Sequence, residues 1–114
     1  MTNLKVEREV FRLEHLYNES NFAKEARKMF SVVETTDWTE NCYNVGIAQT
    51  FITNATNALP LETIVQMASI YTGVPLKEED MTKHLARWIK MGHLRKRTGK
   101  GLSRGVTLYE INFK

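Results

Sequence analysis

Residues 58–97 read ALPLETIVQMASIYTGVPLKEEDMTKHLARWIKMGHLRKR, and this segment is the most informative about the fold. Its apolar residues recur at intervals of three and four positions, which is the spacing of amphipathic helices. Pro60 cannot lie inside a helix, because its ring removes an amide donor and clashes with the preceding turn. The sequence therefore predicts a helix that begins close to Pro60 and ends at Gly73, where a left-handed conformation is favoured. The expected buried residues of this helix are Leu61, Ile64, Val65 and Ala68.

A second helix is predicted after the turn Val74-Pro75-Leu76, and Gly92 is expected to close it. Its first turn is acidic and its body is basic, which is the order that the helix macrodipole favours. The acidic residues are Glu78, Glu79 and Asp80, and the expected inner face consists of Met81, Leu85, Trp88 and Ile89. We therefore expect Trp88 to pack in the core rather than to stack on a ligand.

Beyond Gly92 the apolar spacing changes to two, which is typical of β-strands. Residues 94–98 (LRKRT) and 106–113 (VTLYEINF) are predicted to be two strands, the second being rich in β-branched and aromatic side chains. Residues 99–105 (GKGLSRG) hold three glycines and predict the flexible tip of a β-hairpin. Tyr109, Ile111 and Phe113 alternate along the second strand and are expected to face the core.

Three further helical segments are predicted before Pro60. The first two are amphipathic stripes, either one broken helix or an antiparallel pair, with Asn21 as the N-cap of the second. The third is expected to have Thr39 as its N-cap and to run to about Ala58. Their apolar positions are, in order, Val6, Val10, Leu13 and Tyr17; Phe22, Ala26, Met29 and Val33; and Val45, Ala48, Ile52, Ala55 and Leu59.

The length of 114 residues suits a single domain, and 42% apolar with 25% charged residues is a globular composition. We interpret residues 1–36 as an N-terminal helical extension and residues 37–114 as the domain proper. No apolar run is long enough to span a membrane, and the charged start does not resemble a signal peptide. Cys42 is the single cysteine, so no intramolecular disulfide is possible. We expect a cytoplasmic protein with no membrane partner.

Charge is unevenly distributed along the chain. Residues 1–36 sum to zero, residues 37–80 to −5 and residues 81–114 to +8, which together give the net charge of +3. Eight basic residues and no acidic residue lie between Met81 and Tyr109. Clustered Lys and Arg bind phosphates by releasing condensed counterions, so a polyanion is the expected partner of the last third of the chain.

The order helix, turn, helix, hairpin resembles the winged helix-turn-helix pattern of transcription regulators. The resemblance covers about residues 41–114 and rests on the turn Thr72-Gly73-Val74-Pro75 and the exit Met91-Gly92-His93-Leu94. It implies a mainly α (α+β) fold, in which residues 78–91 form the recognition helix and residues 94–113 form the wing. The implied DNA-binding residues are Thr82, Lys83, Arg87 and Lys90 on the outer face of the helix, beside Ala86, and Arg95, Lys96, Arg97, Lys100 and Arg104 on the wing.

The resemblance implies a small regulator that binds double-stranded DNA. Residues 1–36 would then form a dimerisation helix, although such a segment could equally fold back on its own domain. A homodimer would contact half-sites about 34–36 Å apart, with Lys83 and Arg87 as the best candidates for base contacts. The wing residues would supply most of the phosphate contacts.

The acidic first turn leaves other partners open, because carboxylates repel phosphates. Either the helix docks through its middle, or the wing is the main contact, or the partner is not DNA. One alternative is a protein-binding winged-helix adaptor or inhibitor, for example a phage or plasmid factor that acts on a host protein. Another alternative is an RNA-binding winged helix.

No catalytic residue, metal site or cofactor is predicted. His15, His84 and His93 lie on separate elements, with no Cys or carboxylate at zinc-ligand spacing. Glu78, Glu79 and Asp80 are consecutive on a helix and point in different directions, so they cannot converge on one substrate. The glycine-rich segment 99–105 lacks the spacing of a phosphate-binding loop.

Overall fold

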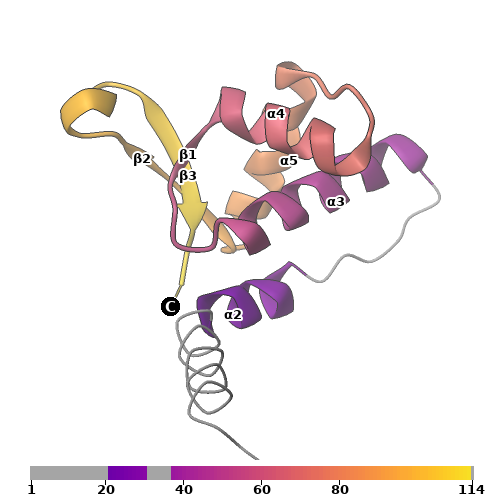
Figure 1. Ribbon diagram of the computed structural model, residues 1–114, viewed down its shortest axis with the longest axis horizontal. Helices are drawn as coiled ribbons and strands as arrows, with labels where there is room; N and C mark the ends of the chain where they lie inside the picture. Colours follow the sequence, from indigo (N-terminus) through magenta and orange to yellow (C-terminus); the bar gives the residue numbers. More distant parts are fainter. Residues whose placement is uncertain (1–20, 31–36, 114) are drawn as a thin grey trace, which may run out of the picture.

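The fold is mainly helical with one small antiparallel sheet (Figure 1). The computed structural model describes residues 21–30 and 37–113. Its elements are α2 (Asn21–Met29), α3 (Trp38–Thr53), β1 (Leu59–Pro60), α4 (Leu61–Thr72), α5 (Glu78–Lys90), β2 (Leu94–Thr98), the 3-10 helix η1 (Gly101–Ser103) and β3 (Thr107–Ile111). The first predicted stripe, Val6 to Tyr17, and Val33 lie outside the described residues.

The sheet has the strand order β1-β3-β2, with β3 in the centre. Leu94 pairs with Ile111 at the base of the hairpin, and Thr98 pairs with Thr107 near its tip. The hairpin therefore forms as the sequence predicts, although β3 is shorter than the predicted 106–113. The sequence analysis did not predict β1, whose Leu59 pairs with Tyr109.

Helix α3 differs at both ends from the sequence prediction. Asp37, not Thr39, is the N-cap, since its carboxylate accepts the Glu40 N–H at 3.2 Å. The helix ends at Thr53 rather than at Ala58, because Asn54 donates both its backbone N–H (3.1 Å) and its side-chain amide (2.9 Å) to the Thr50 carbonyl. The chain is then free to extend into β1.

The prediction of the buried face of α3 is correct for the middle of the helix and wrong for its two ends. Ala48 is buried, and Ile52 and Ala55 pack against the core. Val45 is 38% exposed, and Leu59 belongs to β1 rather than to a helix. The buried face is instead completed by Ile47, Thr50 and Phe51, with Thr50 donating its hydroxyl to the Gly46 carbonyl at 2.7 Å.

Helices α3 and α4 approach each other closely at Gly46. A Cβ atom added at Gly46 would lie 2.7 Å from the Cβ of Ala68, a distance that real side chains do not tolerate. Glycine thus permits the tight crossing of the two helices, and Ile64 and Ala68 are fully buried beside it.

The turn between α4 and α5 agrees with the sequence analysis. Gly73 ends α4 in the left-handed conformation, with φ 68°. Ser69 accepts the Leu76 N–H at 3.0 Å, which holds the turn against α4. Met81, Leu85 and Trp88 of α5 are buried as predicted, and α5 then ends at Lys90.

Helix α2 packs against the core of the domain. Ala26 and Phe30 are buried, and the Phe30 ring lies 4.8 Å from the Trp88 ring and 6.0 Å from the Phe51 ring, measured between centroids. Asn21 was predicted as an N-cap but is the first residue of α2. Residues 21–30 therefore fold back on their own chain.

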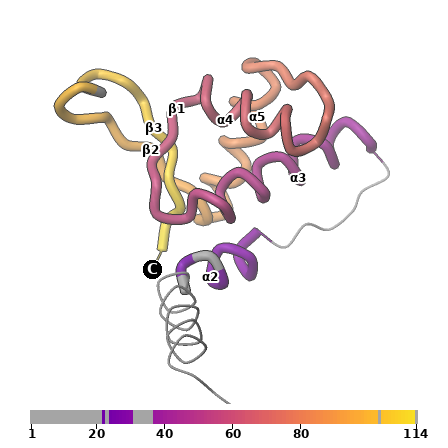
Figure 2. Tube along the Cα trace, in the orientation of Figure 1, coloured from indigo at the N-terminus to yellow at the C-terminus, as the bar shows by residue number. Residues whose placement is uncertain are grey.

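The hairpin tip stands away from the helical body (Figure 2). The tip contains the short 3-10 helix η1, where the sequence predicts only a flexible loop. Val106 is exposed, and Phe113 is half-buried against Phe22, with ring centroids 5.0 Å apart. Tyr109 and Ile111 face the core as predicted.

Candidate nucleic-acid interface

The outer face of α5 gathers the helix residues that the sequence singles out. The helix buries Met81, Leu85 and Trp88, so the positions between them face solvent. The exposed residues are Glu78, Glu79, Thr82, Lys83, Ala86, Arg87 and Lys90. Thr82 donates its hydroxyl to the Glu78 carbonyl at 2.9 Å, which occupies the hydroxyl proton within the helix.

The three carboxylates at the start of α5 do not all point outward. Asp80 is half-buried and accepts the Tyr43 hydroxyl at 3.4 Å, while that hydroxyl accepts the Lys77 N–H at 2.9 Å. Tyr43 thus joins α3 to the first turn of α5. Only Glu78 and Glu79 remain on the exposed surface of this turn.

Arg87, expected to contact bases, forms an ion pair with Glu40 of α3. The Arg87 side chain is 56% exposed and the Glu40 side chain 29% exposed. The guanidinium can still reach a partner in solution, but the carboxylate competes with any phosphate or base edge. This pairing joins residues 47 positions apart in the sequence, so no local pattern could reveal it.

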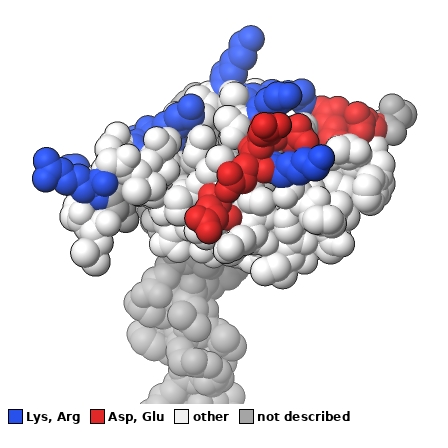
Figure 3. Space-filling model, turned by 90° about the horizontal axis from the view of Figure 1, so that it is seen from above, with Lys and Arg blue, Asp and Glu red and all other residues white. Residues whose placement is uncertain are grey.

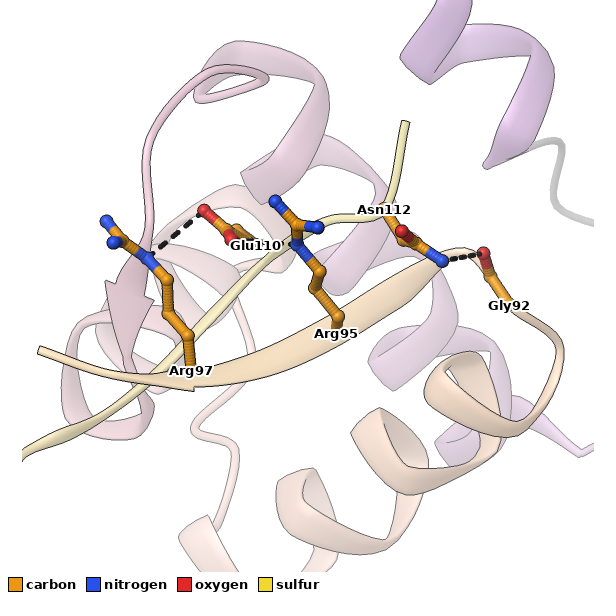
Figure 4. Close-up of polar contacts among 5 residues, drawn as sticks. All are labelled: Gly92, Arg95, Arg97, Glu110 and Asn112. Carbon is orange, nitrogen blue, oxygen red and sulfur yellow. Dashed lines mark hydrogen bonds and ion pairs between the residues drawn. The ribbon is translucent and has the colours of Figure 1, made fainter. Parts of the chain in front are cut away.

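On β2 the run Arg95-Lys96-Arg97 is divided between the two faces of the sheet. Arg95 and Arg97 lie on one face, where both contact Glu110, at 2.9 and 3.3 Å (Figure 4). Lys96 lies on the other face, with its ammonium 5.8 Å from the centre of the Tyr109 ring. The three residues, all expected on the wing as DNA contacts, therefore do not form a single basic row.

Arg95 and Arg97 share one carboxylate, so their pair retains a net positive charge. The Glu110 side chain is only 17% exposed, whereas Arg95 and Arg97 are 60% and 48% exposed. The carboxylate thus lies beneath two guanidinium groups that still present donors to solvent. The close-up also shows the Asn112 amide, which donates to the Gly92 carbonyl at 3.3 Å and joins the end of β3 to the start of β2 (Figure 4).

The hairpin tip carries Lys100 and Arg104, both exposed, on either side of η1. They line a shallow open hollow of about 480 Å³ together with Thr98, Gly99 and Gly101. Within the described part of the chain, no ion pair is formed by Lys83, Lys90, Lys96, Lys100 or Arg104. These five residues are named here the unpaired basic set.

Charge is distributed differently over the hairpin and over the helices. Seen from above, the part of the surface over the hairpin shows basic side chains only, whereas acidic side chains cross the part over the helices (Figure 3). On this face the hairpin is therefore the part that suits a polyanion, because its visible charges are all positive.

His84 lies behind the outer face of α5 and stacks on Tyr43. The two rings are nearly parallel, with centroids 4.7 Å apart and an angle of 4° between their planes. Its Nδ1 is buried and has no hydrogen-bond partner among residues 21–30 and 37–113. Burial, helped by the positive charge of Arg87, lowers the pKa of His84 from 6.5, against the opposing effect of the nearby carboxylates. His84 is therefore a neutral packing residue at pH 7.

A separate cavity of about 230 Å³ lies between α2 and the turn that leads into β2. Glu25 and Met29 line it from α2, and Met91, His93 and Phe113 line it from the body of the domain. None of the predicted DNA-binding residues contributes to it, so this cavity is distinct from the basic surface.

The residues described by the structure include no group of three or more His, Cys, Asp and Glu placed to hold a metal ion. Cys42 is a buried free thiol in α3, and Trp38 is 66% exposed at the start of the same helix. In residues 21–30 and 37–113, no helix is both long and apolar enough to cross a bilayer.

Comparisons of the chain with protein-family models, with curated proteins and with solved structures find no match.

Proposed function

We propose that this protein is a winged helix-turn-helix protein that binds duplex DNA and acts as a transcriptional regulator. In this proposal α4 and α5 are the helix-turn-helix, α5 is the recognition helix, and the β2–β3 hairpin is the wing. The order α3, β1, α4, α5, β2, β3 supports it, as does the sheet order β1-β3-β2.

The observation that carries the proposal is the unpaired basic set, which combines two residues of α5 with three of the hairpin. Cations that lack an acidic partner are free to replace the counterions condensed on a nucleic acid, and this release drives non-specific binding. Paired cations must first give up their carboxylates. We therefore assign the main phosphate contacts to Lys96, Lys100 and Arg104, with Lys83 and Lys90 nearer the groove.

In this proposal the wing makes more of the contacts with DNA than α5 does. The exposed Glu78 and Glu79 would repel phosphates at the start of the helix, and Arg87 is engaged by Glu40. Docking through the middle and end of α5, together with the wing, keeps these carboxylates away from the backbone. We also propose that Lys83 and Arg87 contact bases. A homodimer would form through residues 1–36.

The test is a fluorescence-anisotropy titration of a labelled random duplex at about 50 and 200 mM salt, with unlabelled RNA as competitor. We expect micromolar or tighter binding that weakens steeply with salt and resists RNA. Replacing Lys96, Lys100 and Arg104 by alanine should weaken binding equally on all sequences. The slope of log K against log salt should flatten by about 0.9 for each lost phosphate contact.

Lys77→Ala is the matched control for Lys100→Ala. Each removes one positive charge from an exposed lysine, but Lys77 directly precedes the carboxylates of α5. We expect Lys100→Ala to weaken binding more. Equal effects would mean that only net charge matters. Preferential displacement by RNA would favour the RNA-binding alternative, and no binding at the lower salt would favour a protein partner.

A further inference from the structure

The most exposed large apolar side chain in the described part of the molecule is Leu102, at the apex of the hairpin. Its relative exposure is 108%, against 78% for Ile70, the next in order. A leucine that is fully exposed gains no stability from the folding of its own chain. It would gain stability only by burial against an apolar partner outside the chain.

The backbone around Leu102 is built to hold it outward. Leu102 is the central residue of η1, and the Arg104 N–H closes this turn on the Gly101 carbonyl at 3.1 Å. Gly101 and Gly105 adopt φ values of 63° and 83°, which side chains with a Cβ rarely tolerate. Next to this turn, the Gly99 N–H donates to the Val106 carbonyl at 2.8 Å and closes the hairpin. Leu102 thus stands on a short hydrogen-bonded turn.

The residues on either side of the apex determine which partner fits. Lys100 and Arg104 flank η1, both are exposed, and neither forms an ion pair with a residue that the structure describes. An apolar tip between two cations matches a polyanion whose interior is apolar. Duplex DNA has this chemistry, because phosphates line its grooves and stacked bases lie between them.

We propose that Leu102 inserts from the minor groove between adjacent base pairs and kinks the duplex, while Lys100 and Arg104 hold the phosphates on either side. This inference rests on the proposed function and adds a mode of binding to it. Side chains such as leucine act as wedges of this kind in proteins that bend DNA. Specificity would then depend on how easily a base step is unstacked.

Two measurements on the full chain test the wedge without knowledge of a target site. The first is affinity for a random duplex, where Leu102→Ala should bind about tenfold more weakly because a buried leucine is lost. The second is ligase-catalysed circularisation of duplexes of about 150 bp, close to the persistence length of DNA. The wild-type protein should accelerate ring closure, and Leu102→Ala should not do so at equal occupancy.

Two control variants separate insertion from general effects. Leu102→Met keeps an apolar wedge and should retain both affinity and accelerated ring closure. Ile70→Ala removes an exposed apolar side chain from α4 and should behave as the wild-type protein. Because both sites are exposed, the thermal midpoints of all variants should agree.

The outcomes distinguish the wedge from the proposed function. If the wild-type protein binds duplex DNA without accelerating ring closure, or if Leu102→Ala equals it in both measurements, insertion is wrong and DNA binding stands. If the wild-type protein binds no duplex even at about 50 mM salt, the proposed function fails and the wedge fails with it.

Discussion

At the scale of single residues, the contact of His84 with Tyr43 joins the recognition-helix candidate to the rest of the fold. The imidazole stacks on the phenol ring 4.7 Å away, and the phenol hydroxyl contacts both Asp80 and the backbone of Lys77. The start of α5 is thus fixed through a neutral imidazole with one buried, unpartnered nitrogen. Protonation of that imidazole would place a charge beside Arg87.

The stability of the protein is expected to fall as the pH is lowered below about 6.5, partly because of His84. Its pKa is lowered in the folded state by burial and by Arg87. Between the folded pKa and about 6.5, the unfolded chain binds a proton that the folded chain does not, so acid favours unfolding. Above this window His84 contributes nothing to the pH dependence.

The measurement is the free energy of unfolding at about pH 7.5 and about pH 5.5, for the wild-type protein and for His84→Phe. Phenylalanine keeps the stacking on Tyr43 and cannot titrate, so the variant should lose less stability on acidification. His15 and His93 are present in both proteins and cancel in the comparison. Equal losses in the two proteins would show that His84 does not titrate in this way.

At the scale of elements, the sequence predicts the helices and the hairpin well, because each has its own periodicity and its own glycine or proline boundaries. Gly73 ends α4, and residues 94–98 form β2 as predicted. The strand β1 has only two residues, too few for any alternation to be visible. The end of α3 was missed because Asn54, rather than a glycine or proline, closes it.

The candidate site was predicted less completely than the elements. Exposure of Lys83, Lys90 and Lys100 follows from helical spacing and from the glycine-rich tip. The pairing of Arg87 with Glu40 and of two arginines with Glu110 depends on tertiary contacts. Strand alternation alone could have separated Lys96 from its two neighbours, and this signal was available in the sequence.

The shared carboxylate of the hairpin is expected to weaken the binding of duplex DNA. Glu110→Gln releases Arg95 and Arg97 from their shared carboxylate, so duplex DNA should bind more tightly. The salt slope should steepen by up to about 1.8, which corresponds to two further phosphate contacts. The loss of folding stability should be under about 1 kcal/mol, because the arginines are largely exposed.

Glu62→Gln is the matched control, since it removes one negative charge from an exposed position in the first turn of α4. Anisotropy titrations at several salt concentrations compare the two variants. Identical affinities for Glu110→Gln and Glu62→Gln would contradict a contact through the face of the sheet that bears Arg95 and Arg97.

At the scale of the whole molecule, α2 belongs to the same core as the helices and the sheet. Phe30 is 2% exposed and contacts Trp88 and Phe51 with its ring. Phe30→Ala should therefore lower the free energy of unfolding by about 3–5 kcal/mol, through lost burial and the cavity left behind. Urea denaturation, followed by tryptophan fluorescence, measures this change.

Phe22→Ala is the comparison, because that ring lies against Phe113 but is 49% exposed. Phe22→Ala should lower the free energy of unfolding much less than Phe30→Ala does. A change below about 1 kcal/mol for Phe30→Ala would mean that α2 detaches from the domain at little cost. If the larger value is found, removal of residues 1–36 would open the core, so such a truncation could not isolate a dimerisation role.

The order of the strands has a consequence for synthesis. The central strand β3 is made last, and Leu59 pairs with Tyr109, fifty positions further on (109 − 59). At about 5–20 residues per second, a ribosome needs about 3–10 s to make the intervening chain. During that interval Leu59 has no strand to pair with, and the residues of β2 are made only in its last part. The residues of α3 and α4, which meet at Gly46 and Ala68, are all made before those of β2 and β3, so these two helices can pack together before Leu59 finds its partner strand.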